Sequence, residues 1–287
     1  MLEKWQAVVL GLVEGITEYL PVSSTGHLIL TESLLGLDRP EIKPALDAFA
    51  IVIQAGAILA VLGLYRARVL QMLRGVAGRD ATGLHLLVNL VIAFLPAAIL
   101  GPFLDDWLEA QLFHPLPVLG ALLAGGFWMI WLDRNRDAQS GASALVLDAL
   151  DWRRAFAIGL LQCVAMWPGT SRSMMTIAGG TLVGLRPREA AEFSFLLGVP
   201  TLGAACVYKL AKNLLASSRD GTPNLVETLG AASVAIGFAV ATLSAALAVR
   251  WLVAFLNKHG LAAFGWYRIG LCAVMAVAFW AGWVQTT

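Results

Sequence analysis

Two glutamates stand four residues apart within an apolar N-terminal stretch. Glu14 and Glu18 share one face of a helix, because side chains at positions i and i+4 lie one above the other. In surroundings of low dielectric constant, two carboxylates repel each other unless a cation lies between them. Mg²⁺ and Ca²⁺ prefer carboxylate oxygens, so the pair predicts a divalent metal site. A solvated helix face is the alternative, although acids in apolar membrane segments usually have a function.

A serine and a histidine follow the acids on the other side of a proline. Pro21 ends the first helix, and Ser23 or Ser24 can cap the helix that follows. The free amides of that helix's first turn would bind an anion. Ser24 and His27 are three residues apart, so both side chains can reach one ligand, and the pair is a candidate nucleophile with its acid or base. The alternative is a capping serine beside a core histidine.

A proline and a hydroxyl-rich turn recur in "WPGTSRS", residues 167–173. Gly169 lets the backbone turn, and Thr170 or Ser171 can cap a helix. Arg172 adds a cation whose guanidinium can bind two phosphate oxygens at once, although it could instead pair with one of the glutamates. Two helix N-termini, an arginine and a pair of acids predict an oxyanion site. Phosphate is the ligand that fits such a site best.

The elements that must carry these residues are membrane helices. Hydrophobic residues make up 59% of the 287 residues and charged residues only 14%, against about 25% in soluble domains. A helix needs about 20 mostly apolar residues to cross a bilayer. Long stretches without Asp, Glu, Lys or Arg lie at 48–65, 81–104, 115–132, 228–249 and 269–287. The chain is therefore predicted to be an all-α polytopic membrane protein.

The same composition argues against two other classes. With a net charge of +1, the chain has no basic patch to neutralise the phosphates of a nucleic acid. Cys163, Cys206 and Cys272 lie in apolar segments without the spacing of metal ligands. They are therefore predicted to be small core residues rather than a disulfide or a zinc site.

Two apolar regions are interrupted near their middles. Residues 5–36 are split at Pro21, and residues 155–185 are split by 167–173. Each half has about 12–16 residues, which at 1.5 Å per residue is too short to cross the membrane. We therefore expect two re-entrant helix–loop–helix segments, whose irregular backbone is buried in protein or lines a wet cavity. Six spans remain, at about 48–65, 84–104, 116–132, 190–209, 228–256 and 262–284.

The loops between these spans carry Lys and Arg unequally. Twelve fall on one side, which the positive-inside rule predicts to be cytoplasmic: Arg66, Arg68, Arg74, Arg79, Arg134, Arg136, Arg153, Arg154, Arg186, Arg188, Arg250 and Lys258. Six fall on the other side: Lys4, Arg39, Lys43, Lys209, Lys212 and Arg219. The first broken segment then enters from outside and the second from the cytoplasm. This is an inverted repeat within one integral membrane domain, with halves of about 1–110 and 111–287 and a site where the broken helices meet.

"EGITEYLPVSSTGH" (14–27) and "PGTSRSMMT" (168–176) together resemble the undecaprenyl-pyrophosphate phosphatase, or bacitracin-resistance, family. The resemblance extends over the whole chain, including "FAIVIQAGAILAV" (49–61) and "FGWYRIGL" (264–271). It implies an integral enzyme of the plasma membrane that removes the terminal phosphate from a polyprenyl pyrophosphate lipid. The product would be the monophosphate carrier that cell-wall synthesis uses again. The site is expected to open to the outer face of the membrane.

The family's motifs fall on residues that the patterns already single out. The resemblance places its glutamate pair on Glu14 and Glu18, its serine–histidine motif on Ser24 and His27, and its arginine motif on Arg172, so catalytic roles are expected for Glu18, Ser24, His27 and Arg172. The Mg²⁺ or Ca²⁺ ion predicted from the acid pair would lie at Glu14 and Glu18. Gln54 is a polar residue inside a charge-free span, which indicates a buried amide near the site. Contacts with the substrate are expected from Thr25, Gly26, Gln54, Thr170, Ser171 and Ser173.

Alternatives remain open for both the reaction and the function. Attack by Ser24 would give a phosphoserine that water later cleaves, whereas direct attack by a metal-activated water is the competing route. A lipid or small-molecule transporter or flippase is the main rival function, because inverted repeats with broken helices are frequent in that class. A phosphatase with a histidine nucleophile would need a further histidine after the arginine motif, where only His259 is available.

Overall fold

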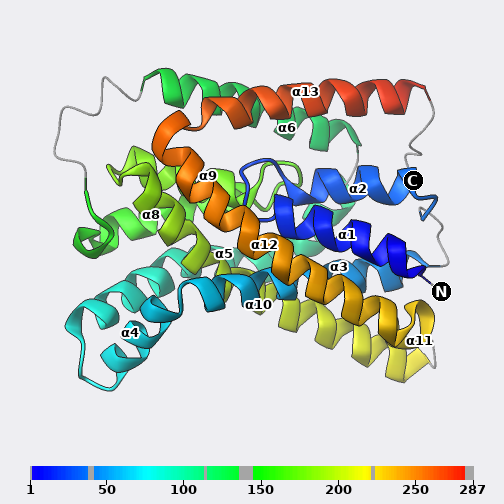
Figure 1. Cartoon of the computed structure of the whole chain (residues 1–287), viewed down its shortest axis with the longest axis horizontal. Helices are drawn as coiled ribbons and strands as arrows, with labels where there is room; N and C mark the ends of the chain where they lie inside the picture. The colour runs from blue at the N-terminus through cyan, green and yellow to red at the C-terminus, as the bar shows by residue number, and fades with distance from the viewer. Residues whose placement is uncertain (1, 38–41, 113–114, 136–144, 221–223, 282–287) are drawn as a thin grey trace.

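Long helices build nearly the whole of the protein (Figure 1). The computed structural model describes residues 2–37, 42–112, 115–135, 145–220 and 224–281. Of the charged residues used to orient the chain, Arg39 and Arg136 lie outside these ranges. Within the described residues, the only β-type pairing is an isolated bridge between Leu145 and Leu185. The predicted all-α class is confirmed.

Six helices are long and apolar enough to cross a bilayer, as the sequence predicts. They are α3 (Lys43–Leu64), α5 (Ala81–Leu112), α6 (Pro115–Arg134), α10 (Pro187–Asp220), α12 (Ala231–His259) and α13 (Ala262–Trp280). Several run beyond their predicted ends, because a helix continues into the polar boundary where apolar patterning no longer marks it. Pro96 and Pro102 lie inside α5 without ending it. The chain is a multi-pass membrane protein.

Four shorter helices form two hairpins with a break in each. They are α1 (Lys4–Thr17) with α2 (Ser24–Leu34), and α8 (Trp152–Val164) with α9 (Arg172–Leu182). The longest of them, α1, has 14 residues and a length of about 21 Å, below the roughly 30 Å of a bilayer core. In Figure 1 the two connecting loops meet near the centre of the molecule. That the hairpins are re-entrant stays a prediction.

The helices of the two halves pack in corresponding ways. The first broken hairpin lies against the other half through α1 and α12, and the second does so through α8 and α5. Between the halves, α3 also packs against α10, whereas α6 and α13, which pack against each other, both fall in the predicted second half. Two units of opposite orientation would give this pattern. The half boundary near residue 110 stays a prediction.

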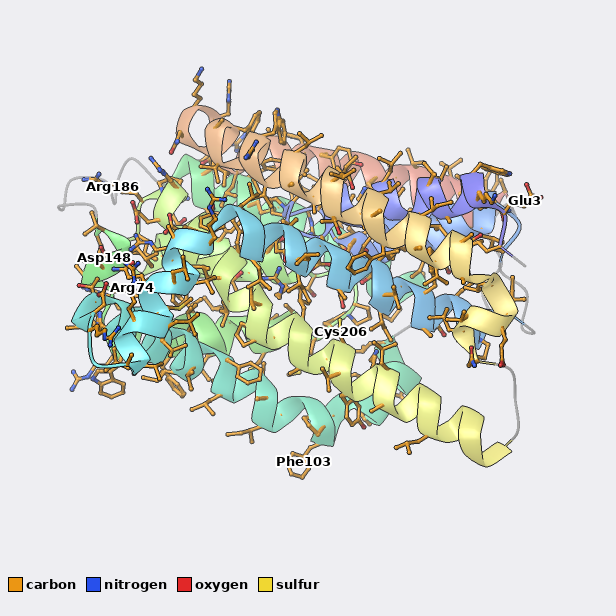
Figure 2. All side chains as sticks on the ribbon, turned by 60° about the horizontal axis from the view of Figure 1, so that its bottom comes forward. Glu3, Arg74, Phe103, Asp148, Arg186 and Cys206 are labelled. Carbon is orange, nitrogen blue, oxygen red and sulfur yellow. The ribbon has the colours of Figure 1, made fainter. Side chains whose placement is uncertain are left out.

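Charged residues gather at the two ends of the bundle. Figure 2 shows Arg74, Asp148 and Arg186 at one end and Glu3 at the other. The short helices α4 (Arg66–Val76) and η1 (Leu147–Ala149) belong to the first end, and α11 (Leu225–Leu229) precedes α12. At the first end, Arg68 of α4 donates to Glu192 at 2.7 Å and to Asp148 at 2.9 Å. These ion pairs tie α4 to α10 and to η1 on the side that the sequence predicts to be cytoplasmic.

Glycine lets α1 approach α12 closely, which fixes where the two glutamates lie. A Cβ added at Gly15 would come within 2.1 Å of the Ser244 hydroxyl and 2.4 Å of the Ala241 carbonyl. Backbone cannot move aside as a flexible side chain can. Close approach through small residues is how membrane helices gain packing energy, because lipid is as apolar as the helix surface.

Gly15→Ala should therefore lower the melting temperature of the purified protein in detergent by about 5 °C, since overpacking costs about 1–3 kcal/mol. Gly63→Ala in α3 is the matched control, because its added Cβ meets nothing within 4 Å. Equal melting temperatures for both variants would contradict the packing argument.

Candidate active site

Each broken hairpin turns at a serine whose backbone is left-handed. Ser23 has φ 73° and Ser171 has φ 74°, and no other non-glycine residue in the described part of the chain has a positive φ. They are the N-caps of α2 and α9, where their hydroxyls accept from the amides of Gly26 at 3.5 Å and Met174 at 3.3 Å. This conformation costs a residue with a Cβ about 1–2 kcal/mol. Matching strain in the two turns makes them candidates for functional segments.

Glu18 connects the two turns. The Ser24 hydroxyl donates to its Oε2 at 2.8 Å, and Arg172 Nη2 lies 3.4 Å from its Oε1. The carboxylate is buried, yet both oxygens have partners. The sequence predicts that Arg172 meets either phosphate or a glutamate, and here it contacts Glu18. A charged acceptor at this distance is well placed to take the serine proton.

Contacts on several sides hold the guanidinium of Arg172 in place. Its Nη1 donates to the Ser194 carbonyl at 3.0 Å, and its guanidinium lies 5.6 Å from the centre of the Tyr19 ring. Gly198 leaves room for it, because an added Cβ would lie 3.0 Å from Nη2. Its Nε is buried without a partner among the described residues. The arginine therefore keeps one donor for an oxyanion.

Arg172→Lys should lower kcat/KM by about 100-fold, although the charge is kept. Lysine has a single nitrogen, which cannot reach the Ser194 carbonyl, Glu18 and a phosphate together. Phosphate release by the purified variant measures the effect. Arg74→Lys, at the far end of the bundle, is the control and should keep full activity. A near-normal Arg172→Lys enzyme would make this arginine structural.

No hydrogen bond joins the side chains of His27 and Ser24. The Nδ1 of His27 lies 2.7 Å from the Ser23 carbonyl oxygen, and its Nε2 lies 2.7 Å from the hydroxyl of Tyr267. A carbonyl can only accept, so Nδ1 carries the proton and Nε2 is the acceptor in the neutral ring. The sequence predicts a Ser24–His27 pair at one ligand. The structure pairs Ser24 with Glu18 instead, and any proton that His27 exchanges passes through Nε2.

One of the expected binding residues, Ser173, joins the hairpins to each other, and a second, Ser171, lies beside it. Ser173 is fully buried, and its hydroxyl donates to the Leu20 carbonyl of the first hairpin at 2.8 Å. Ser171 lies 3.0 Å from Ser173, oxygen to oxygen. The Ser173 hydroxyl thus joins the two turns, and Ser171 contacts that hydroxyl from within the second hairpin.

The other expected binding residues are spread more widely. Thr25 is half-buried in the first turn of α2, next to Gly26, and Thr170 is buried in the turn before α9. Gln54 lies on α3, where its Oε1 accepts from Cys206 of α10 at 3.6 Å. Figure 2 shows Cys206 midway along the bundle. Gln54 is therefore a residue of the α3–α10 interface, and its contact with a substrate stays a prediction.

The glutamate pair suits a divalent cation. Glu14 is only 2% exposed. Among the described residues, none forms a hydrogen bond or a salt bridge with its carboxylate. The described residues contain no cluster of three or more His, Cys, Asp or Glu. Mg²⁺ is commonly held by one or two carboxylates, waters and a substrate phosphate, so two carboxylates are sufficient. A buried acid without a partner is the observation that favours the ion.

The rival site with a histidine nucleophile finds no support in the geometry. His259 lies at the end of α12 and stacks on Phe255, with ring centres 4.6 Å apart. It belongs to the end of a membrane span, whereas His27 and Arg172 lie in the central turns.

The fold and the site define a class: a multi-pass membrane protein in which two broken hairpins bring a serine, a buried glutamate and an arginine together. Comparison with known proteins specifies the family. The family described as "Bacitracin resistance protein BacA" matches residues 7–274. The chain belongs to this family.

Named relatives agree with the family match. "Undecaprenyl-diphosphatase" of Sorangium cellulosum is 45% identical over 271 residues, which cover 94% of this chain and 85% of the relative. "Undecaprenyl-diphosphatase 2" of Rhodospirillum rubrum is 44% identical over 98% of this chain and 96% of the relative. "Undecaprenyl-diphosphatase" of Nitrosospira multiformis is 41% identical with the same coverage.

Proposed function

We propose that the protein is an undecaprenyl-diphosphate phosphatase, which hydrolyses the lipid diphosphate to the monophosphate and inorganic phosphate. One observation carries the proposal: a serine hydroxyl at the start of one helix donates to a buried glutamate, which also contacts an arginine at the start of another helix. Family membership and the names of the relatives support the same reaction. They lend no support to the transporter alternative.

The reaction follows from the contacts of Ser24. The diphosphate is bound by Arg172 and by the free amides in the first turns of α2 and α9. Ser24 Oγ attacks the terminal phosphorus and gives its proton to Glu18. The P–O bond to the bridging oxygen breaks, and the lipid monophosphate leaves. Water then cleaves the phosphoserine, which releases phosphate and restores Ser24. Direct attack by water is the competing route.

A divalent cation at Glu14 and Glu18 forms part of the proposal. When bound, it would neutralise phosphate charge beside the two carboxylates. Chelation should abolish phosphate release, and Mg²⁺ or Ca²⁺ should restore it. Glu14→Gln should raise the cation concentration needed for half-maximal rate by at least about 10-fold. Ca²⁺ should raise the melting temperature of the unmodified protein but not that of Glu14→Gln. Full activity after exhaustive chelation would remove the metal from the mechanism.

The proposed location is the plasma membrane, with the α1–α2 hairpin entering from the outer face and the site open to that side. The unequal distribution of Lys and Arg supports this orientation. Arg74→Cys should react with an impermeant thiol reagent only after the membrane has been opened. Labelling of intact cells at that position would reverse the orientation.

The function is tested with purified protein in detergent and a synthetic polyprenyl diphosphate. Release of inorganic phosphate, with the lipid monophosphate in equal amount, is the expected result. Movement of intact lipid diphosphate between the leaflets of proteoliposomes, without phosphate release, would favour the transporter.

A further inference from the structure

Arg268 of α13 is a fully buried arginine that the proposed reaction does not use. It lies in "FGWYRIGL", the closing stretch of the sequence resemblance, for which no role has been given. Eighteen of the twenty Lys and Arg residues fall on the two faces of the predicted topology. The remaining two are Arg172 and Arg268. Charged residues at membrane depth are costly and usually functional.

The guanidinium of Arg268 binds backbone carbonyls in two places. It donates to Ala121 at 3.0 Å and Leu122 at 3.2 Å on α6, and to Gly169 at 2.7 Å and Thr170 at 3.1 Å in the second turn. No carboxylate is paired with it in the described part of the chain. Arginine's fixed fork suits several acceptors at once, so this residue fastens the turn before Arg172 to α6.

These bonds also decide which way the turn amides point. A peptide group is planar, with its carbonyl and the following N–H on opposite sides. With the Thr170 carbonyl bound by Arg268, the N–H of Ser171 points away from α13. Gly169 adopts its φ of 90° without strain because it has no Cβ, but Ser171, with φ 74°, is strained, and the carbonyls that Arg268 binds directly precede it.

The preceding residue, Tyr267, supports the first turn through His27. Its hydroxyl lies 2.7 Å from His27 Nε2, and the two rings are nearly parallel, 5.6 Å apart. His27 Nδ1 in turn binds the carbonyl of Ser23, the other strained serine. Adjacent residues of one helix therefore support both left-handed serines, Tyr267 through His27 and Arg268 through the carbonyls beside Ser171.

The neighbouring helix leaves space for this arrangement. A Cβ added at Gly125 of α6 would lie 2.6 Å from Arg268 Nη2 and 3.0 Å from its Cζ. A Cβ at Gly120 of the same helix would meet nothing within 4 Å. The guanidinium therefore occupies a gap that one particular glycine provides.

We propose that Tyr267 and Arg268 are positioning residues of the phosphatase site. They hold the N-termini of α2 and α9 in the relative position at which Ser24 and Arg172 contact the same phosphate. The inference rests on the proposed function. It predicts a loss in kcat that exceeds any loss of folded protein, because displacing a reacting group by about 1 Å can cost 100-fold in rate.

Four variants test the inference: Arg268→Met, Gly125→Ala, Tyr267→Phe and the control Gly120→Ala. For each, kcat, KM and the melting temperature are measured on purified protein. Arg268→Met should lower the melting temperature, because four backbone carbonyls lose their donor, and it should also lower kcat per folded enzyme by about 100-fold. Gly125→Ala and Tyr267→Phe should each lower kcat by at least about 10-fold with little change in KM. Gly120→Ala should match the unmodified protein.

The double variant of Gly125→Ala and Arg268→Met gives the clearest test. Gly125→Ala should add little further loss in the Arg268→Met background, because it acts through Arg268. Unchanged kcat in Gly125→Ala and Tyr267→Phe would overturn the inference, as would activity lost only in proportion to folded protein. If the unmodified protein releases no phosphate, the proposed function fails, and that outcome is separate from the failure of the positioning roles.

Discussion

Glu18→Gln should lower kcat by about 100-fold or more, because a general base typically contributes that much to a rate. In the structure Glu18 accepts from Ser24 and contacts Arg172, so one substitution changes both partners. An amide cannot take the serine proton, and it no longer compensates the arginine's charge. Phosphate release at saturating substrate measures the change.

The control for this variant is another buried glutamate outside the turns. Glu32 of α2 lies 3.4 Å from Lys43 and has no contact with Ser24 or Arg172. Glu32→Gln should keep kcat within a few fold. Glu18→Gln should remain folded but melt at a lower temperature, because Arg172 loses its buried counter-charge, so kcat is compared per folded protein. An active Glu18→Gln enzyme would remove this residue as the base and leave it as a partner of Arg172.

The sequence predicts the helices of this protein well, because a helix that crosses a membrane must have about 20 apolar residues. Six apolar stretches become the six long helices, and the prolines at 21 and 168 mark the two breaks. Hydroxyl residues after each break become helix N-caps, as expected. The patterns leave open whether Ser23 or Ser24, and whether Thr170 or Ser171, is the cap. Left-handed backbone at Ser23 and Ser171 decides it, and propensities do not predict that conformation for serine.

Contacts across the turns are the part that spacing does not predict. Ser24 and His27 lie three apart on one helix, which favours a shared ligand, but His27 binds Tyr267 from the far end of the chain. Glu18 reaches Ser24 because the break folds the chain back, and helical periodicity does not apply across it. Both pairings depend on tertiary structure.

The sequence marks Arg268 as a charged residue inside a predicted membrane span, but the list of charge-free stretches hides it. The last of these begins at residue 269, so a search for uncharged runs starts just beyond the arginine. The predicted span at 262–284 nevertheless contains it, and a cation inside a span is itself a functional hypothesis. Counting charges within spans, as well as between them, would have found it.

Ser24→Ala should remove nearly all phosphate release, because alanine has no oxygen to attack phosphorus. The N-cap of α2 is Ser23, and the Ser24 hydroxyl donates to Glu18 rather than to a backbone group. The substitution should therefore spare the roughly 1 kcal/mol that a lost cap costs. Binding should survive better than turnover, since the Arg172 and amide contacts remain. Thr31→Ala removes a hydroxyl from the same helix that bonds only its own helix backbone, and it should keep full activity.

Covalent trapping then separates the two routes to the same product. With substrate labelled in its terminal phosphate, rapid quenching of the unmodified enzyme should give a labelled peptide that contains Ser24, at a level that rises and falls before steady state. Glu18→Gln should slow the appearance of this label, because the glutamate takes the serine proton in the first step. An enzyme that turns over fully without labelled protein at any time would favour direct attack by water. An active Ser24→Ala variant would end the nucleophile role of Ser24, and Glu18 would then be the base for water at the same phosphorus.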